Sequence, residues 1–394
     1  MGDYFLLLLA LLVMLAVFLR DPFVFTLVYI LAGAYALARW WSTRAMAGLR
    51  FKRQFTPRAF PGETVSVRLD LENAGRLPIV WLYVSESLPT ELSRGQNIRE
   101  VVTLGPRASA RIDYRVYPRA RGYHRLGPVL LRMGDVLGLF KEIDRRGEPE
   151  YLIVYPEVVH LAGVRIPSWS PMGQIRDRLP IFADPARTIG KRPYQSGDSL
   201  RGVDWKSTAA VGSLQVKLQE PSVALQAHIL LNFNEADYWS RTRIDDSELA
   251  VVISASLANW VVGRKEAVGL ATNGLDPLFG DRPCQTVPAG RGRAQLMRVL
   301  ETLARVRAGE GESYEPLVRR EAAHLPWGAA MILVTPAAGQ GLFDEIVAAR
   351  RRGIHVMLVL CGPTPEAGEI RKKAQMLGIA FAYLQRRADL EAWR

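Results

Sequence analysis

Ala329-Ala-Met-Ile-Leu-Val-Thr335 is a continuous apolar run, and Ile354-His-Val-Met-Leu-Val-Leu360 is a second one a short distance along the chain. Between them, Phe343 to Arg352 has helical spacing and is followed by Gly353. Strands buried on both faces of a parallel sheet have short continuous apolar runs, and parallel neighbours are usually joined by a helix. These residues therefore predict a β–α–β unit in the C-terminal half.

The same alternation continues on both sides of this unit. We expect further strands at 227–233, 267–271 and 379–384, and helices at 247–262, 294–307 and 366–377. This order predicts a doubly wound α/β domain with helices on both faces of the sheet. Because ligands of such sheets bind beyond the carboxyl ends of the strands, a ligand site is expected in segments 232–237, 271–274 and 335–339.

The middle of the chain, residues 46–150, has a different period. Thr64 to Leu71 and Arg111 to Tyr117 alternate between apolar and polar residues, and 79–84 and 129–133 are further apolar runs. Pairs such as Pro61-Gly62 and Gly127-Pro128 separate the runs as turns. Several short strands at this spacing predict an antiparallel β-sandwich.

Two uncharged stretches open the chain, Tyr4 to Leu19 and Phe23 to Ala38. Asp21 suits a helix N-cap and Pro22 the first helical position. We expect a transmembrane helical hairpin within residues 1–45, with spans of the bilayer at about 4–19 and 23–38. A cleaved signal peptide fits poorly, because Asp3 stands where such a segment carries basic residues. A buried core hairpin is the other alternative.

Basic residues near the spans indicate the orientation. Arg20 is alone between the spans, whereas six basic residues follow the second one: Arg39, Arg44, Arg50, Lys52, Arg53 and Arg58. By the positive-inside rule, the body of the protein should face the cytoplasm from the plasma membrane. The formal net charge of +12 suggests an anionic neighbour, although a basic solvated surface explains it equally well.

Few motifs in this sequence indicate catalysis or cofactor binding. The sequence contains no P-loop, no His-Glu-x-x-His and no Gly-x-Ser-x-Gly, and its two cysteines, Cys284 and Cys361, are far apart. We therefore expect no enzyme and no cofactor. Basic residues are scattered without regular aromatic interleaving, so we expect no nucleic-acid binding either.

One polar segment stands out, between Arg192 and Ala209. Asp198 and Asp204 could form an acid–base pair, or they could form ion pairs with Arg201 and Lys206 in a structural loop packed by aromatic residues. We favour the structural interpretation.

This segment, Tyr194-Gln-x-Gly197-Asp198-x-x-Arg201-x-x-Asp204-Trp205-Lys206-x-x-Ala209, closely resembles the signature of the family catalogued as domain of unknown function 58. The order of two N-terminal spans, a β-rich segment, the signature and an α/β half also agrees. The resemblance implies that 191–394 hold the signature and a von Willebrand factor A-like domain, behind a linker at 151–190. It also implies a MoxR-type AAA+ ATPase as a partner.

Domains of that kind often hold a divalent ion in a metal-ion-dependent adhesion site with the motif Asp-x-Ser-x-Ser. Here Asn232, Asn234 and Ala236 stand at those three positions, and Thr335 ends the later strand where many such domains have an aspartate. Mg²⁺ usually requires a carboxylate, so we expect a degenerate site without a stable metal ion.

The resulting hypothesis is a non-enzymatic, membrane-anchored scaffold that docks a cytoplasmic protein. Two alternatives remain open. One is an enzyme that uses Asp198 and Asp204 in a cleft. The other is a binder of lipid or nucleic acid through its basic surface.

Overall fold

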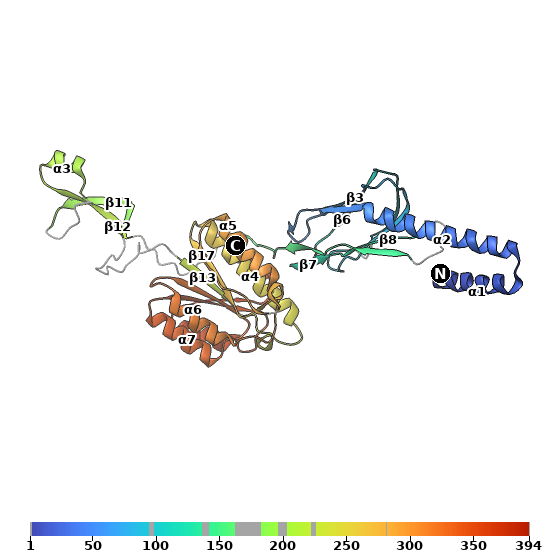
Figure 1. The fold of residues 1–394 in the computed structure, drawn as a ribbon. Helices are drawn as coiled ribbons and strands as arrows, with labels where there is room; N and C mark the ends of the chain where they lie inside the picture. The colour runs from blue at the N-terminus through green and yellow to red at the C-terminus, as the bar shows by residue number, and fades with distance from the viewer. Residues whose placement is uncertain are drawn as a thin grey trace. The chain divides into compact units, whose positions relative to one another are not determined.

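The computed structural model describes residues 2–93, 98–135, 142–161, 183–195, 203–221, 226–280 and 282–393. The chain divides into two compact units, which are described separately (Figure 1). The first comprises residues 1–157 with 303–306, and the second comprises 158–302 with 307–394.

Two helices open the first unit, α1 (Gly2–Leu19) and α2 (Pro22–Gly48). Asp21 caps α2 by accepting a hydrogen bond from the backbone N–H of Phe23 at 2.8 Å. The rings of Phe5 and Tyr35 stack at 5.5 Å, which places the two helices side by side. Helix α2 is long and apolar enough to cross a bilayer, whereas the apolar stretch Phe5–Leu19 is shorter.

Helix α2 continues ten residues beyond the predicted end of its span. Its last turns pass directly into the β-rich region, because Ala45 and Met46 are buried in the core of that region together with Leu49. Its 27 residues rise about 40 Å, which exceeds the ~30 Å of a hydrocarbon core. The helix therefore connects rigidly to the strands that follow.

Two antiparallel sheets bury a common core behind α2. The first has the order β1-β3-β6 and the second β5-β4-β8-β9. The strands are β1 (Leu49–Gln54), β3 (Val65–Asn73), β4 (Ile79–Glu86), β5 (Ile98–Leu104), β6 (Ser109–Val116), β8 (Val129–Met133) and β9 (Ile143–Arg146). Alternate residues of β3 are buried, as its sequence period predicts, and they pack against buried residues of β4 and β8. A small third sheet contains β2 (Arg58–Ala59), β7 (Gly122–Leu126) and β10 (Glu150–Val154).

One of the six predicted juxtamembrane cations is not on the surface. Arg53 is buried, and its guanidinium lies 2.5 Å from the buried carboxylate of Glu86. Tyr114 donates a hydrogen bond to the other oxygen of Glu86. Arg53 is therefore neutralised inside the unit and cannot touch lipid, because strand alternation turns it inward while Arg50 and Lys52 remain exposed.

The second unit begins with a two-stranded antiparallel ribbon of β11 (Ala183–Pro193) and β12 (Gln215–Pro221), which carries the short helix α3 (Trp205–Val211). Strand β10 thus occupies the start of the predicted linker 151–190, and β11 occupies its end. The ribbon contains the described part of the signature segment.

The predicted α/β region follows and is confirmed. Its sheet has the order β17-β14-β13-β18-β19-β20, and all neighbours are parallel except β17 with β14. The strands are β13 (Gln226–Leu231), β14 (Ala267–Thr272), β17 (Val287–Gly290), β18 (Ala330–Thr335), β19 (His355–Cys361) and β20 (Ala380–Leu384). The small pair β15 (Leu275–Asp276) and β16 (Arg282–Pro283) follows β14.

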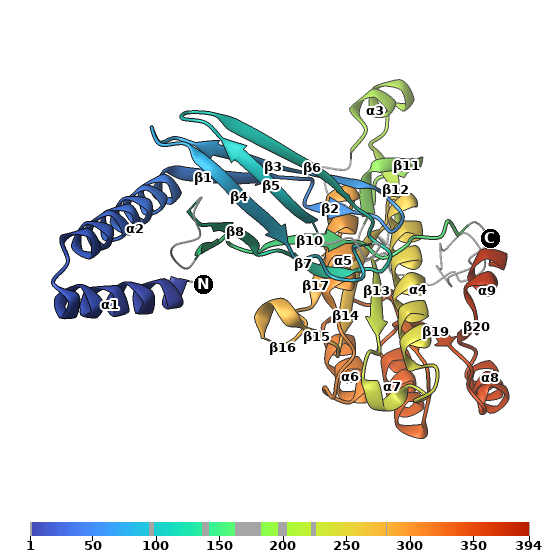
Figure 2. The same ribbon diagram turned by 90° about the vertical axis from the view of Figure 1, so that its right-hand side faces the viewer.

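Helices cover both faces of this sheet. Figures 1 and 2 show α4 (Arg243–Gly263) and α5 (Arg293–Arg305) on one face, with α6 (Tyr314–His324) and α7 (Gln340–Arg351) on the other. Helix α8 (Ala367–Met376) shares the core of α6 and α7, and α9 (Arg387–Ala392) closes the chain.

Helix α6 was not predicted from the sequence. Tyr314, Leu317, Val318 and Ala322 are buried at helical spacing behind Ser313, which stands at the N-cap position. This spacing was a usable signal, although Pro316 and the adjacent Arg319 and Arg320 obscured it.

Candidate functional site

The order of the strands defines where a site should form in the second unit. Chain order reverses between β13 and β18, because β14 lies on one side of β13 and β18 on the other. Such a switch point opens a crevice at the carboxyl ends of the two strands. Asn232 follows β13 and Thr335 ends β18, and the amide nitrogen Nδ2 of Asn232 donates to Oγ1 of Thr335 at 3.1 Å.

The side chain of Asn232, only 2% exposed, has all of its hydrogen-bonding positions occupied. Nδ2 also donates to Oδ2 of Asp237 at 2.8 Å. Oδ1 accepts the backbone N–H of Asn234 at 3.2 Å and Nδ2 of Asn273 at 3.1 Å. A primary amide has two donors and two acceptor positions, so nothing remains for a ligand. The amide NH₂ group thus lies between a carboxylate and a hydroxyl, as a cation would.

Asn273, at the carboxyl end of β14, is a second buried amide in this network. Its Oδ1 accepts the backbone N–H of Phe233 at 2.6 Å, and its Nδ2 donates to the carbonyl oxygen of Glu312 at 2.9 Å. The backbone partners of both amides determine which end of each side chain is the donor. Asn273 lies in the segment 271–274 that the strand pattern indicated, but its role was not predicted.

The other predicted ion-site positions have structural roles. Asn234 caps the 3₁₀ turn η2 (Glu235–Asp237) by accepting the N–H of Ala236 at 3.3 Å. Glu235 forms an ion pair with Arg243. Asp237 is therefore the one carboxylate in this turn that contacts Asn232. Within the described parts of the chain, no group of three or more His, Cys, Asp or Glu side chains could hold a metal ion.

A buried acid lies near the end of the neighbouring strand β19. Asp246 accepts a hydrogen bond from Oγ1 of Thr242 at 2.5 Å, and burial raises the pKa of its carboxyl. Gly362 has φ +79°, and a Cβ there would come 2.7 Å from the Asp246 carboxyl carbon. Burial also raises the pKa of the Cys361 thiol. A thiol held protonated is a poor nucleophile, so Cys361 is not suited to covalent catalysis.

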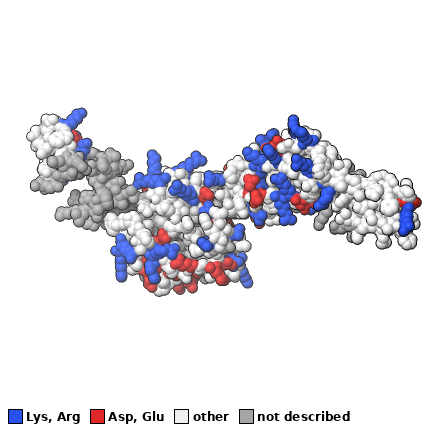
Figure 3. All heavy atoms as spheres, viewed as in Figure 1, with Lys and Arg blue, Asp and Glu red and all other residues white. Residues whose placement is uncertain are grey.

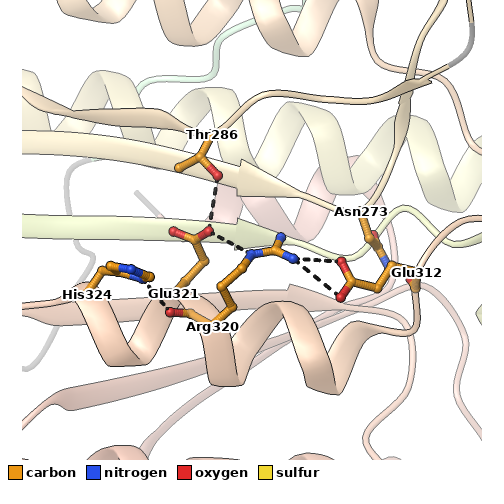
Figure 4. Close-up of polar contacts among 6 residues, drawn as sticks. All are labelled: Asn273, Thr286, Glu312, Arg320, Glu321 and His324. Atoms are coloured by element: carbon orange, nitrogen blue, oxygen red, sulfur yellow. Dashed lines mark hydrogen bonds and ion pairs between the residues drawn. The ribbon is translucent and has the colours of Figure 1, made fainter.

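A chain of polar contacts leads from this edge along α6 (Figure 4). The carboxylate of Glu312, whose carbonyl oxygen accepts from Asn273, also accepts from Arg320 at 3.0 Å. Nε of Arg320 lies 3.6 Å from Glu321, which accepts from Thr286 at 3.1 Å. The second oxygen of Glu321 faces Nε2 of the buried His228 at 3.4 Å.

Glu321 should make the stability of the second unit depend on pH. The contact with Nε2 of His228 is the largest of the effects that hold the Glu321 pKa below its usual 4.5, and the hydrogen bond from Thr286 and the charge of Arg320 lower this pKa as well. A lowered folded-state pKa stabilises the fold above the unfolded-state pKa, and this stabilisation disappears as the pH falls through the folded-state pKa.

We expect Glu321→Gln to lower the free energy of unfolding by about 1–3 kcal/mol at neutral pH. Below about pH 4.5, the stability of this variant should fall less with pH than that of the wild type. Hydrogen exchange of β13 amides in the detergent-solubilised chain would measure both effects. Glu366→Gln, an exposed carboxylate, is the matched control. The prediction would be contradicted if the stability of Glu321→Gln fell with decreasing pH as steeply as that of the wild type.

The described part of the signature forms a turn at the end of the ribbon. Asp204 is the N-cap of α3, where it accepts from the N–H of Ser207 at 3.1 Å and lies 3.0 Å from Nζ of Lys191. Those two contacts, led by Lys191, lower the Asp204 pKa. The backbone N–H of Tyr194 donates to Leu214, and Trp205 and Lys206 are exposed. Gly197, Asp198 and Arg201 lie outside the described residues.

Large apolar side chains are exposed around the carboxyl edge of the sheet. Trp239 and Ile244 follow η2 and are 56% and 74% exposed, and Leu278 and Phe279 are exposed in the turn between β15 and β16. Exposed apolar patches of this kind mark protein-binding surfaces. Trp327 is equally exposed but precedes β18, at the opposite edge of the same sheet.

Residues 190–326 match the family described as protein of unknown function DUF58. This range runs from the end of β11 to just beyond α6, so it contains the signature, β13 with Asn232 and the α6 network, but not β18 with Thr335. A protein of Bacillus subtilis (strain 168), named uncharacterized protein YeaD, is 25% identical over 220 residues, which cover 55% of this chain and 53% of that protein. The chain therefore spans about half the length of this relative.

Two solved structures resemble parts of the chain. The CARDB domain of a Pyrococcus furiosus protein is 14% identical and covers 27% of this chain and 91% of its own, with a TM-score of 0.21. Proximal thread matrix protein 1 of the mussel byssus is 14% identical and covers 43% of this chain and 46% of its own, with a TM-score of 0.32. Scores this low carry no conclusion about function.

Proposed function

We propose that this protein is a non-enzymatic scaffold, anchored in the plasma membrane by α1 and α2, that docks a cytoplasmic protein through its α/β domain. The observation that carries the proposal is the carboxyl edge of the sheet. A saturated amide at the switch point offers no open ligand position, and large apolar side chains are exposed in the segments that follow β13 and β14.

Docking at this edge would not require a metal ion. In a von Willebrand factor A-like domain with an intact site, the partner supplies a carboxylate to the bound ion. Here the Nδ2 group of Asn232 occupies the space between Asp237 and Thr335. Burial of large apolar side chains contributes most of the binding energy at many protein interfaces. Trp239 and Ile244 are the residues best placed to supply it.

The membrane anchor and its orientation belong to the same proposal. Helix α2 supplies the length and apolar composition, and α1 would complete a hairpin. Without the buried Arg53, five basic residues still follow the second span, against Arg20 alone between the spans. That imbalance favours a cytoplasmic body. The family resemblance indicates a MoxR-type AAA+ ATPase as the partner.

The test is affinity purification of the tagged full chain from membranes, with Mg²⁺ or with EDTA, followed by mass spectrometry. We expect an AAA+ ATPase to co-purify in both conditions with the wild-type protein and with Trp327→Ala. The double variant Trp239→Ala/Ile244→Ala should capture at least about tenfold less ATPase. Truncating one anchor residue of an interface typically weakens the binding free energy by about 2 kcal/mol or more. Stability should change little in either variant, since all three side chains are exposed.

Three results would contradict the proposal. Capture that depends on Mg²⁺ would contradict metal-independent docking. Equal losses in the double variant and in Trp327→Ala would mean that the carboxyl edge is not the docking surface. Recovery of the wild-type chain with no stable partner would remove the scaffold role and favour the alternatives of an enzyme using Asp198 and Asp204 or a lipid binder.

A further inference from the structure

The end of α7 and the middle of α8 present a basic surface on the second unit. Residues 350–376 contain six basic residues and only two acidic ones, Glu366 and Glu369. All six basic side chains are exposed: Arg350, Arg351, Arg352, Arg371, Lys372 and Lys373. On the face of the α/β body that Figure 3 draws, positive side chains lie along the top and at the lower left, and negative ones lie along the bottom.

Two of these six residues hold the surface together. Arg350 donates from its guanidinium to the carbonyl oxygen of Leu377, just after α8. Lys373 donates to Oε1 of Gln340 at 3.4 Å and lies 5.6 Å from the centre of the Phe343 ring. Both contacts join α7 to α8. The exposed basic residues of the two helices therefore lie on adjacent elements of the second unit.

The other four, Arg351, Arg352, Arg371 and Lys372, have no carboxylate within ion-pair distance among the described residues. Helix α6 of the same unit provides a contrast, because Arg319 pairs with Glu345 at 2.5 Å and Arg320 pairs with Glu312 at 3.0 Å. Charge compensation at a helix C-terminus accounts for Arg351 at the end of α7, but not for Arg371 and Lys372 in the middle of α8.

An apolar side chain accompanies these charges. Met376 is 82% exposed and lies four residues after Lys372, on the same outward face of α8. Among the described residues of α7 and α8 there is no exposed aromatic side chain, since Phe343 is buried. Single-stranded nucleic acids are usually held by stacking on such rings. Exposed cations beside a flexible apolar side chain instead suit a phospholipid surface.

We propose that the surface formed by Arg351, Arg352, Arg371, Lys372 and Met376 binds the anionic headgroups of the bilayer in which the chain is anchored. The inference rests on the proposed membrane anchor, which would supply that bilayer at high effective concentration. Arginine matches lipid phosphate with two parallel hydrogen bonds, and Met376 reaches the acyl boundary. Each cation near an anionic surface contributes about fivefold to binding.

The test uses the full chain in nanodiscs, with an environment-sensitive dye on Met376→Cys in a Cys284→Ser background, since Cys361 is buried. Quenching by spin-labelled lipid reports contact between α8 and the bilayer. We expect quenching in discs that contain phosphatidylglycerol but not in discs of phosphatidylcholine alone. Reversing the four charges, as R351E/R352E/R371E/K372E, should weaken the contact at least about tenfold.

The matched control reverses exposed arginines beside and on α5, as R291E/R293E/R298E, and should keep the contact. An equal loss in that control, or quenching that does not depend on lipid charge, would overturn the lipid site while leaving the anchor intact. A dye that lipid does not quench but added RNA shields would assign the surface to nucleic acid instead. A chain that fails to enter the discs would overturn both the anchor and this inference.

Discussion

Replacing Arg53 by methionine is expected to lower the free energy of unfolding of the first unit by about 3–5 kcal/mol, because Glu86 would remain buried without its positive partner. Both side chains are almost completely inaccessible, at 2% and 0%. Arg53 also donates to Glu150 at 3.3 Å, and Tyr114 donates to Glu86. No other basic group lies within ion-pair distance of Glu86 among the described residues.

The loss of stability in Arg53→Met should depend on pH, and the pKa of Glu86 determines the direction. Burial already raises the pKa of Glu86, and Arg53 opposes that increase. Without Arg53 the folded-state pKa rises further above the unfolded-state value. The variant should therefore be most stable below the unfolded-state pKa and lose stability as the pH rises through the folded-state pKa.

Hydrogen exchange of β4 amides across the pH range would measure this loss. Arg50→Met, an exposed arginine on the same strand, should change stability by no more than about 0.5 kcal/mol. The double variant Arg53→Met/Glu86→Leu should be less damaging than Arg53→Met, because it removes the unpaired charge. A double variant at least as unstable as the single one would show that packing, not charge, is what Arg53 contributes.

Asn232→Asp should convert the switch point from a metal-independent to a metal-dependent site. The substitution keeps the shape of the side chain but replaces the Nδ2 donor with an oxygen 2.8 Å from the Asp237 carboxylate and 3.1 Å from Oγ1 of Thr335. Two carboxylates and a hydroxyl are ligands that Mg²⁺ accepts. Without a cation, we expect a loss of about 2–4 kcal/mol from like-charge repulsion and lost hydrogen bonds.

Thermal unfolding of the full chain with Mg²⁺ or EDTA would measure the change. The midpoint of Asn232→Asp should rise with Mg²⁺ concentration, as ligand binding to the folded state requires, while that of the wild type should not respond. Asn234→Asp is the matched control, because that side chain caps η2 and does not lie between Asp237 and Thr335. A wild-type midpoint that responds to Mg²⁺ would contradict both this prediction and metal-independent docking.

Sequence pattern alone was sufficient where an element carries its own periodicity. The strands around Leu230, Leu333 and Leu358 have runs of five or more buried residues, so their existence and their parallel arrangement were predictable. The sequence pattern did not predict where α2 ends. Arg39 and Arg44 marked the end of an uncharged span, but charged residues on one side do not end a helix whose other side, with Ala45 and Met46, is buried.

Arg53 illustrates a property that local sequence does not contain. Its position among basic residues after a membrane span indicated contact with lipid, and nothing nearby marked it as buried. Its partner Glu86 is 33 residues away and comes from the opposite sheet of the same core. Burial there follows from the direction in which Arg53 leaves strand β1 and from the packing of the two sheets.

The sequence by itself determined the five parallel strands of the α/β sheet, although not the antiparallel edge strand β17, and that Asn232, Asn273 and Thr335 each stand at the carboxyl end of a strand. Only the tertiary structure decided that the Asn232 amide lies between Asp237 and Thr335, with its oxygen facing Asn234 and Asn273. Asn232 and Thr335 are 103 residues apart, and they meet because β13 and β18 pair in one register. Register depends on packing across the whole sheet, whereas periodicity depends on neighbouring residues alone.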